Sequence, residues 1–140
     1  LFEGFPKGAL DGMIAMRPAE PTGAGPEAFV AAAKAAGVES GSTFQQQSYD
    51  AMFLIALALE KNNGSKDGLS AALRDVANAP GEVILPGEWS KAVELIKAGT
   101  DIDYQGASGL VEFDANGDVA GSVVEMKVEN DAFVAVGPLT

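Results

Sequence analysis

The residues best suited to recognition lie together at the predicted start of a helix. They are Phe44, Gln45, Gln46, Gln47 and Tyr49. The free N–H groups of a helix start carry a partial positive charge, which favours the polar or anionic end of a small ligand. An aromatic ring beside them would contact an apolar part of the same ligand. The alternative is that Phe44 packs in the core and the glutamines face solvent.

Two carboxylates close in sequence offer a second chemistry. Asp101 and Asp103 are candidates for an acid/base pair. Carboxylate-pair hydrolysis requires two such groups converging in a pocket at roughly 5 to 9 Å. We favour a solvated loop for both residues, and assign no catalytic residue. A small acidic carboxylate-dependent hydrolase is therefore the less favoured alternative function.

A further cluster of polar residues, at residues 114–118, resembles the start of a calcium-binding loop. Asp114, Asn116 and Asp118 alternate as EF-hand ligands do, but an EF-hand needs glycine at its sixth position, and Gly117 is the fourth. Asn-Gly is the dipeptide that a type I′ hairpin turn prefers. We therefore predict a hairpin turn at Asn116-Gly117 and no metal site.

The composition excludes several classes of function. The chain has no histidine and no cysteine, which removes the commonest general base, the thiolate nucleophile and most transition-metal sites. A net charge of -11 repels phosphate backbones, so nucleic acid is not an expected partner. Apolar residues make up 47% of the chain, enough to form a packed core. We expect no enzyme and no cofactor.

The longest predicted helix lies within residues 42–64, and the other elements are arranged around it. Thr43 and Gln46 have the spacing of a capping box, with Thr43 as N-cap, and Gly64 suits the helix end. Residues 51–59 are apolar on nearly every side. We therefore expect most faces of this helix to be covered.

Three shorter helices are predicted from caps and apolar spacing. Their expected ranges are 26–36, 67–78 and 87–98. Phe29, Val30 and Ala33 form the buried stripe of the first, and Gly37 stops it. Asp67 is the expected N-cap of the second.

The β segments are predicted at the two ends of the chain. They cover residues 10–17, 109–113, 119–128 and 133–136. Apolar residues at 124, 126 and 128 alternate with Glu125, Lys127 and Glu129, which predicts one buried face and one solvated face. Asn130-Asp131 makes the last turn, and residues 101–109 are expected to form a loop that leads into a strand.

Two motifs resemble the C-terminal part of the type I periplasmic solute-binding proteins. They are Tyr49-Asp50-Ala51 at the opening of the apolar helix, and Y-Q-G-A-S-G-L-V-E-F-D-A-N-G-D-V at residues 104–119. Alternating strand residues and a terminal D-A-F-V follow. More narrowly, the chain looks like the branched-chain amino acid (Leu/Ile/Val) binding subgroup of ABC transporters. The resemblance spans nearly all of the chain.

The resemblance implies an α/β class: a C-terminal fragment of a two-lobed type I periplasmic-binding-protein fold, with a helical middle and β segments at both ends. Residues 1–18 would be a second-lobe strand segment. Residues 19–121 would be a first-lobe helical segment with a hairpin, and residues 122–140 would be strands that return to the second lobe. The segment 10–17 should then pair with the terminal strands.

The resemblance also implies a function. The chain would be the substrate-binding component of an ABC importer, capturing an amino acid or related small carboxylate between two lobes. Phe44, five positions before the tyrosine of the Y-D-A helix, takes the place of an aromatic residue that contacts ligand in relatives. Gln45 and Gln46 are further candidates. Groups that hold the ligand's carboxylate and ammonium would lie upstream of Leu1, so the fragment alone should bind poorly.

The implied partners are a small solute and an ABC permease in the membrane, and the implied location is the periplasm. A ligand-sensing regulator of the same fold is the alternative function. Truncation would leave an open sheet edge and apolar surface, so we also expect dimerisation or strand exchange of the fragment.

Overall fold

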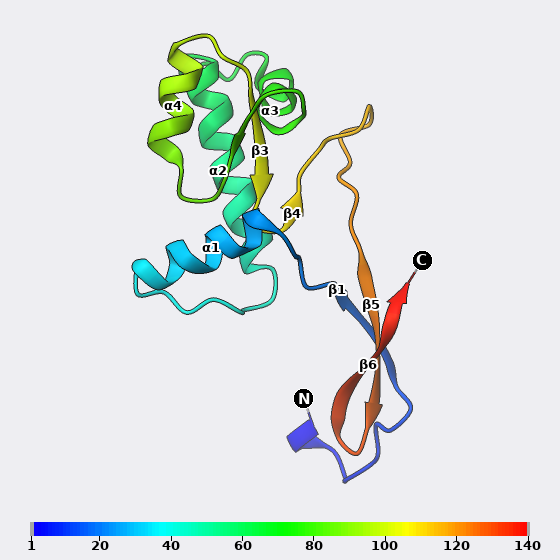
Figure 1. Ribbon diagram of the computed structural model, residues 1–140. Helices are drawn as coiled ribbons and strands as arrows, with labels where there is room; N and C mark the ends of the chain where they lie inside the picture. The colour runs from blue at the N-terminus through cyan, green and yellow to red at the C-terminus, as the bar shows by residue number, and fades with distance from the viewer. Residues whose placement is uncertain (1, 140) are drawn as a thin grey trace. The chain divides into compact units, whose positions relative to one another are not determined.

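The computed structural model describes residues 2–139, and Figure 1 shows its elements in chain order. They are η1 (Phe2–Gly4), β1 (Ile14–Pro18), α1 (Ala24–Ala35), α2 (Gln45–Lys61), α3 (Leu69–Ala77), β2 (Glu82–Ile84), α4 (Trp89–Lys97), β3 (Ile102–Gly106), β4 (Gly109–Leu110), β5 (Val123–Glu129) and β6 (Ala132–Leu139). This mixed architecture confirms the predicted α/β class. Within the described part, no helix is long and apolar enough to cross a membrane.

The chain divides into two compact units. Unit 1 combines Leu1–Glu20 with Gly121–Thr140, and unit 2 comprises Pro21–Ala120. Each unit has its own small sheet, with strand order β1-β5-β6 in unit 1 and β2-β3-β4 in unit 2. The assignment of residues 1–18, 19–121 and 122–140 to two lobes stays a prediction.

Unit 2 has a continuous hydrophobic core. In Figure 1, α2, α3 and α4 lie around β3, and the parallel pair β2 and β3 is connected through α4. Leu57 of α2, Val76 of α3, Ala92 of α4, and Ile84 and Ile102 of the sheet are fully buried in one cluster. Burying a large aliphatic side chain contributes about 1.5–3 kcal/mol, so this cluster is the main source of stability in the unit.

The structure corrects two predictions for the long helix. It begins at Gln45 with Phe44 as N-cap and no side-chain cap hydrogen bond, so the capping box at Thr43 is wrong. Leu54, Leu57 and Ala58 are buried, but Met52 is 68% exposed and Ile55 is also exposed. Apolar residues on every side of α2 therefore did not mean that every side is buried. One face of α2 contacts the core, and the described residues leave the opposite face uncovered.

The shorter helices lie close to their predicted ranges, with corrections at single residues. In α1, Phe29 and Ala33 are buried as expected, but Val30 is exposed because the buried face is narrower than the predicted stripe. In α3, the N-cap is Gly68 in a left-handed conformation and not Asp67. Gly25 in the first turn of α1 is required, because a Cβ there would overlap the main-chain carbonyl of Gly106.

β3 was not predicted, and it is the central strand of the unit 2 sheet. Residues 101–109 were expected to form a loop, whereas Ile102 and Tyr104 are buried and Asp103 is only 8% exposed. A strand buried on both faces lacks the alternating apolar and polar pattern of a half-exposed strand. The acidic residues at 101 and 103 further concealed it.

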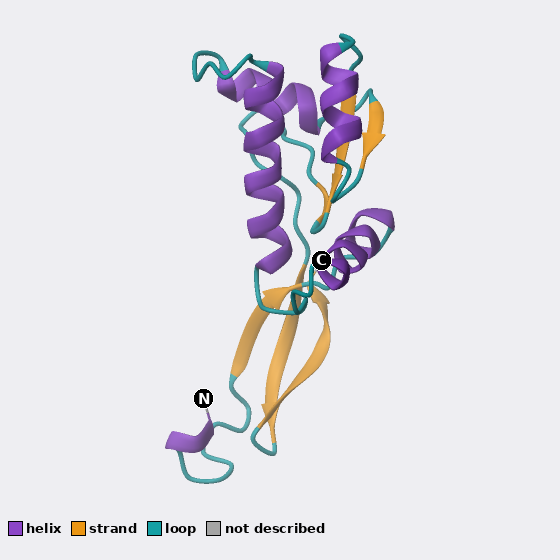
Figure 2. Ribbon diagram, turned by 90° about the vertical axis from the view of Figure 1, so that its left-hand side faces the viewer, coloured by secondary structure: helices purple, strands orange, loops and turns teal. Residues whose placement is uncertain are grey.

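Unit 1 is an antiparallel sheet whose strands come from the two ends of the chain. The prediction that segment 10–17 pairs with the terminal strands is confirmed, because β1 pairs with β5 from Ile14↔Lys127 to Pro18↔Val123. Figure 2 shows the strands of this sheet side by side. The Gly8 N–H donates to Asp131 Oδ1 at 2.8 Å across 123 residues of sequence. Met126 and Val128 of β5 face the buried side, as their alternation predicts.

The two predicted turns have different outcomes. Asn130 and Asp131 both have positive φ (53° and 59°), as a type I′ turn between β5 and β6 requires. At Asn116-Gly117 only Gly117 has positive φ, so the type I′ prediction there is wrong. The expected hairpin is reduced to a single bridge, Phe113↔Val119, and β4 pairs with β3 instead.

Candidate functional site

The start of α2 is built around the Gln45 side chain. Its Oε1 accepts hydrogen bonds from the N–H groups of Gly41 at 2.9 Å and Ser42 at 3.3 Å, and its Nε2 donates to the Glu39 carbonyl at 2.8 Å. These three bonds fold the segment 39–44 against the helix start. Gln45 is therefore committed to holding its own loop in place.

Phe44 is held in a conformation that disfavours a bulky side chain. As N-cap of α2 it has φ 62° and ψ 13°, in the left-handed region, and the residue is 56% exposed. A non-glycine residue in this region costs on the order of 1–3 kcal/mol and persists where the surrounding structure fixes it. The Phe44 carbonyl accepts from the N–H of Ser48 at 3.0 Å and from its Oγ at 2.8 Å. An apolar ring is thus presented to solvent at a fixed position.

The two following glutamines, unlike Gln45, do not hold the loop before α2 by hydrogen bonds in the described part of the chain. Gln46 and Gln47 are half-buried, and Oε1 of Gln47 is a buried acceptor without a donor among the described residues. Leaving such a group unpaired costs about 1–3 kcal/mol. The described residues therefore leave the amide oxygen of Gln47 without a hydrogen-bond donor.

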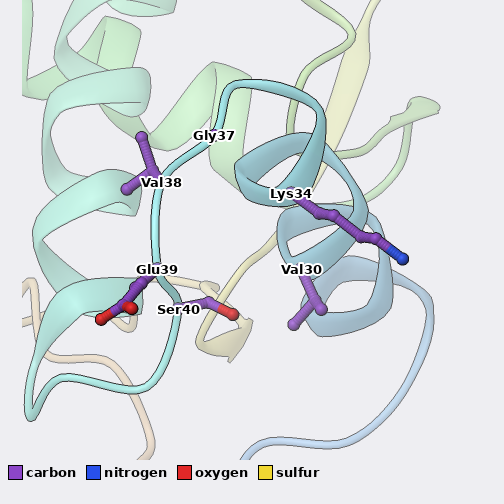
Figure 3. A pocket seen from close by; sticks show the side chains of 6 residues that line it. All are labelled: Val30, Lys34, Gly37, Val38, Glu39 and Ser40. Atoms are coloured by element: carbon purple, nitrogen blue, oxygen red, sulfur yellow. The ribbon is translucent and has the colours of Figure 1, made fainter.

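Two cavities lie between α1 and the segment that leads into α2. One, of about 360 Å³, is lined by Phe29, Ala32, Ala33, Ala36, Val38, Gln45 and Tyr49. The other, of about 480 Å³ and shown in Figure 3, is lined by Val30, Lys34, Gly37, Val38, Glu39 and Ser40. Of the three residues predicted to contact ligand, Gln45 lines the first cavity. Phe44 and Gln46 line neither, so the structure does not bring the three together around one cavity.

Tyr49 closes the apolar cavity with a packed ring. Its ring lies 5.2 Å from that of Phe29 and 5.5 Å from that of Phe53, and its hydroxyl accepts from the Gly87 N–H at 2.9 Å. Burial raises the pKa of the Tyr49 hydroxyl, with the Asp50 charge adding to the shift. The hydroxyl therefore stays protonated at neutral pH.

Asp50 is a buried acid of unit 2 with four hydrogen bonds to its carboxylate, and no role was predicted for it. The carboxylate is 2% exposed and accepts from the Tyr104 hydroxyl, the Ala107 N–H and the Ser108 N–H, each at 2.7 Å, and from Ser108 Oγ at 2.6 Å. Burial raises the pKa of Tyr104 far above its usual range, helped by the bond to Asp50. Because both of its oxygens accept hydrogen bonds, Asp50 fixes the β3–β4 loop to α2.

A signal for this role was present in the sequence. An acid directly before the apolar run of a helix is expected to be paired when it is buried. Gly106 supports the same arrangement, because a Cβ there would lie 2.6 Å from Asp50 Oδ2 and 2.7 Å from Val111 Cγ2. Part of the Y-Q-G-A-S-G run that carries the family resemblance therefore forms the partner of Asp50.

Asp101 and Asp103 do not act as a pair. Asp101 is exposed and its Oδ1 lies 3.4 Å from Nζ of Lys61, whereas Asp103 is buried and its Oδ2 accepts from Nε2 of Gln105 at 3.3 Å. The expected solvated loop holds for Asp101 and is wrong for Asp103. Their separate partners remove the basis of the hydrolase alternative.

Asp114 holds the turn at residues 114–118 with its side chain. Its Oδ1 accepts from the N–H groups of Asn116 at 2.8 Å, and of Gly117 and Asp118 at 2.9 Å. These main-chain bonds hold the pKa of the Asp114 carboxyl below its usual value. Within residues 2–139, histidine and acidic side chains form no group of three that would hold a metal ion.

Comparisons with known proteins agree with a binding role. No solved structure was found to match the chain. The chain is 32% identical over 73 residues to the "Chemotactic signal transduction system substrate-binding protein BasB" of Halobacterium salinarum. That match covers 51% of this chain and 18% of the relative, so the chain spans far less than two thirds of the relative's length.

The family comparison covers most of the chain. Residues 4–129 match the family described as "Receptor family ligand binding region". A family of ligand-binding regions agrees with the prediction that the chain is not an enzyme, and the two small sheets with their helices are consistent with part of a type I periplasmic-binding fold. The chain accordingly belongs to the receptor family of ligand-binding regions.

Proposed function

We propose that this chain is part of a solute-binding protein that captures an amino acid or related small carboxylate, with Phe44 contacting the apolar part of the solute. The observation that carries the proposal is the geometry of Phe44. A large apolar ring is costly to leave in water, and a left-handed N-cap is costly for phenylalanine. Phe44 carries both costs, and this is expected where a side chain serves binding.

The neighbouring groups suit the other end of such a solute. The first N–H groups of α2, a helix of 17 residues, carry partial positive charge, and Gln46 and Gln47 add amide groups beside them. Gln45 supports the site indirectly, by fixing the segment before Phe44. Further ligand contacts would come from polypeptide outside residues 1–140, as the greater length of the relative suggests.

The proposed mechanism is closure of two lobes around the solute. A ligand that contacts both lobes stabilises the closed arrangement and increases its population. In the transport version of this function, the closed protein delivers the solute to an ABC permease from the periplasm. The branched-chain amino acids are the first solutes to test, because the apolar ring of Phe44 suits their side chains.

The experiment is calorimetric titration of the full-length protein with a panel of amino acids and small carboxylates, followed by two substitutions at one position. Phe44→Ala removes the ring and keeps the strained backbone, whereas Phe44→Gly removes the ring and the strain together. If the ring contacts the solute, both variants lose affinity by about tenfold or more, because about 1.5–3 kcal/mol of apolar contact is lost.

A matched control is Met52→Ala, which removes a side chain of similar size and greater exposure from the same helix. Its affinity should equal that of the wild type. Full affinity in Phe44→Gly would show that Phe44 acts only as a strained cap, and would reject its role in binding. The absence of binding to every member of the panel would reject amino acids and small carboxylates as the solute class.

A second candidate function is ligand sensing. The observation that favours it is the name of the relative, which places that substrate-binding protein in a chemotactic signal transduction system. In this version, closure around the solute reports to a signalling partner instead of a permease. Co-purification of the full-length, ligand-loaded protein with a receptor rather than with a permease would support sensing over transport.

A further inference from the structure

The outer edge of β2 has an unusual arrangement of charged side chains. β2 is an end strand of its sheet, and the main-chain groups of a strand alternate between its two edges. The Glu82 N–H donates to the Asp101 carbonyl at 2.8 Å. The main-chain N–H and carbonyl of Glu82 therefore point towards β3, and those of Val83 point to the outer edge. Outward main-chain groups of this kind are a template for pairing with another chain.

Two side chains at the start of α4 occupy this edge. Lys91 Nζ donates to the Val83 carbonyl at 2.7 Å, and Glu88 Oε2 accepts from the N–H of Leu85 at 2.9 Å. Leu85 directly follows β2, which ends at Ile84, and continuing the alternation of the strand places its N–H on the same edge as the Val83 carbonyl. Nζ of Lys91 and Oε2 of Glu88 are 3.4 Å apart, so the pair keeps both side chains along the strand. One acceptor and the next donor of the edge are thereby satisfied by side chains of opposite charge.

Stability alone is a weak reason for this arrangement. Both side chains remain partly exposed, at 47% and 37%, and exposed ion pairs contribute only about 0–1 kcal/mol. Pro86 follows two residues after the end of β2 at Ile84 and prevents the strand from extending further. Charged side chains, lysine above all, together with proline are the features by which sheets avoid association through their edges.

We propose that Glu88 and Lys91 guard the outer edge of β2 against pairing with a second copy of this chain. A second copy is the relevant partner because a two-fold antiparallel arrangement sets the Val83 edge of one copy against the Val83 edge of the other. The Val83 side chain is exposed and would add apolar contact to such a pair. β2 is then the outer boundary of its sheet in the folded protein.

The first test uses Lys91→Met in the full-length protein, which keeps the apolar stem and removes the charge and the donor. We expect dimers that increase with concentration in sedimentation velocity, with slowed amide exchange at Val83. The control is Lys97→Met on the same helix. It makes the same change at an exposed residue whose ion pair, with Glu60 at 3.6 Å, does not involve main-chain atoms of β2. This variant should behave as the wild type does, as should Lys91→Arg, which keeps a charged donor.

The second test exploits the absence of cysteine in residues 1–140. Val83→Cys gives a reporter at the centre of the edge. Under oxidation with diamide, it should form a disulfide-linked dimer in the Lys91→Met background, and at least tenfold less in the Lys97→Met background. Equal cross-linking in both backgrounds, or a Lys91→Met protein no more associated than the wild type, would overturn the proposal. If circular dichroism shows that Lys91→Met is unfolded, Lys91→Ala carries the same expectation, because it also removes the charge and the donor to the Val83 carbonyl.

Discussion

The two units of this chain cover their sheets to very different degrees. In unit 2, Ile84 and Ile102 are fully buried beneath helices. In unit 1, Met126 and Val128 of β5 are buried, whereas Ile14 and Met16 of β1 are 65% and 67% exposed. A small sheet needs a covered apolar face for independent stability. The comparison indicates that unit 2 supplies most of the cooperative stability, and that unit 1 is the first part of the chain to open.

The largest effect should follow from removing a side chain at the centre of unit 2. Leu57→Ala leaves a cavity in a fully buried cluster, and we expect a loss of about 2–5 kcal/mol in the free energy of unfolding. Denaturant titration followed by the fluorescence of Trp89, the only tryptophan, reports on this unit. A loss below about 1 kcal/mol would contradict the central place given to this cluster.

A smaller effect is expected from the corresponding change in unit 1. Met126→Ala removes one of the few buried side chains of the β1-β5-β6 sheet, where neighbours can collapse more freely, and we expect a loss of about 2 kcal/mol or less. Amide exchange should accelerate in β1, β5 and β6 and remain unchanged in α2. Equal acceleration in both units would show that they unfold together, and would break the comparison.

The ionisation of tyrosine at alkaline pH should act on unit 2 alone, because Tyr49 and Tyr104 are the only tyrosines of the chain and both lie in that unit. Burial raises the folded-state pKa of Tyr104. Its contribution to stability is therefore complete below the unfolded pKa of about 10 and is lost as the pH rises from there through the folded-state pKa. At pH 11 the loss from this residue should be about 1.4 kcal/mol relative to neutral pH.

Tyr104→Phe tests this expectation. The variant should be less stable at neutral pH, because the bond to Asp50 is lost, and its stability should fall less between pH 9 and pH 11, as measured by denaturant titration. The same slope in the variant and the wild type would assign the alkaline loss to other groups.

The smallest effect is expected at the surface of unit 1. Arg17 forms an ion pair with Glu20 at 2.6 Å, but both side chains are exposed to solvent. Such pairs contribute about 0–1 kcal/mol, so Arg17→Ala should change the free energy of unfolding by less than about 0.5 kcal/mol. A larger loss would mean that the β1 edge depends on this ion pair for its stability.

The sequence predicted unit 1 better than the centre of unit 2. Alternation along residues 123–129 and the positive-φ turn at Asn130-Asp131 are local patterns, and both were recognised. β3 was missed because a strand buried on both faces has no alternation, and because Asp103 reads as a surface residue. The open face of α2 was missed for the opposite reason, since apolar residues such as Met52 do not reveal whether anything covers them.

The candidate site shows the same division between local and tertiary information. The chemistry of Phe44 and the glutamines could be listed from the sequence, but the left-handed cap at Phe44 and the loop bonds of Gln45 could not. Asp50 was visible as an acid in an apolar helix. Its partners Tyr104 and Ser108 lie 54 and 58 residues away, and only the folded chain brings them together.

The pairing of β1 with β5 has a consequence for the order in which the chain folds. During synthesis, β1 leaves the ribosome well before its partner strands, with all of unit 2 still to be made. Closing so long a loop is slow and entropically costly until unit 2 has become compact. Until β5 has been made, Ile14 and Met16 lack the partner strand that the folded chain gives them, which makes this short segment a target for chaperones.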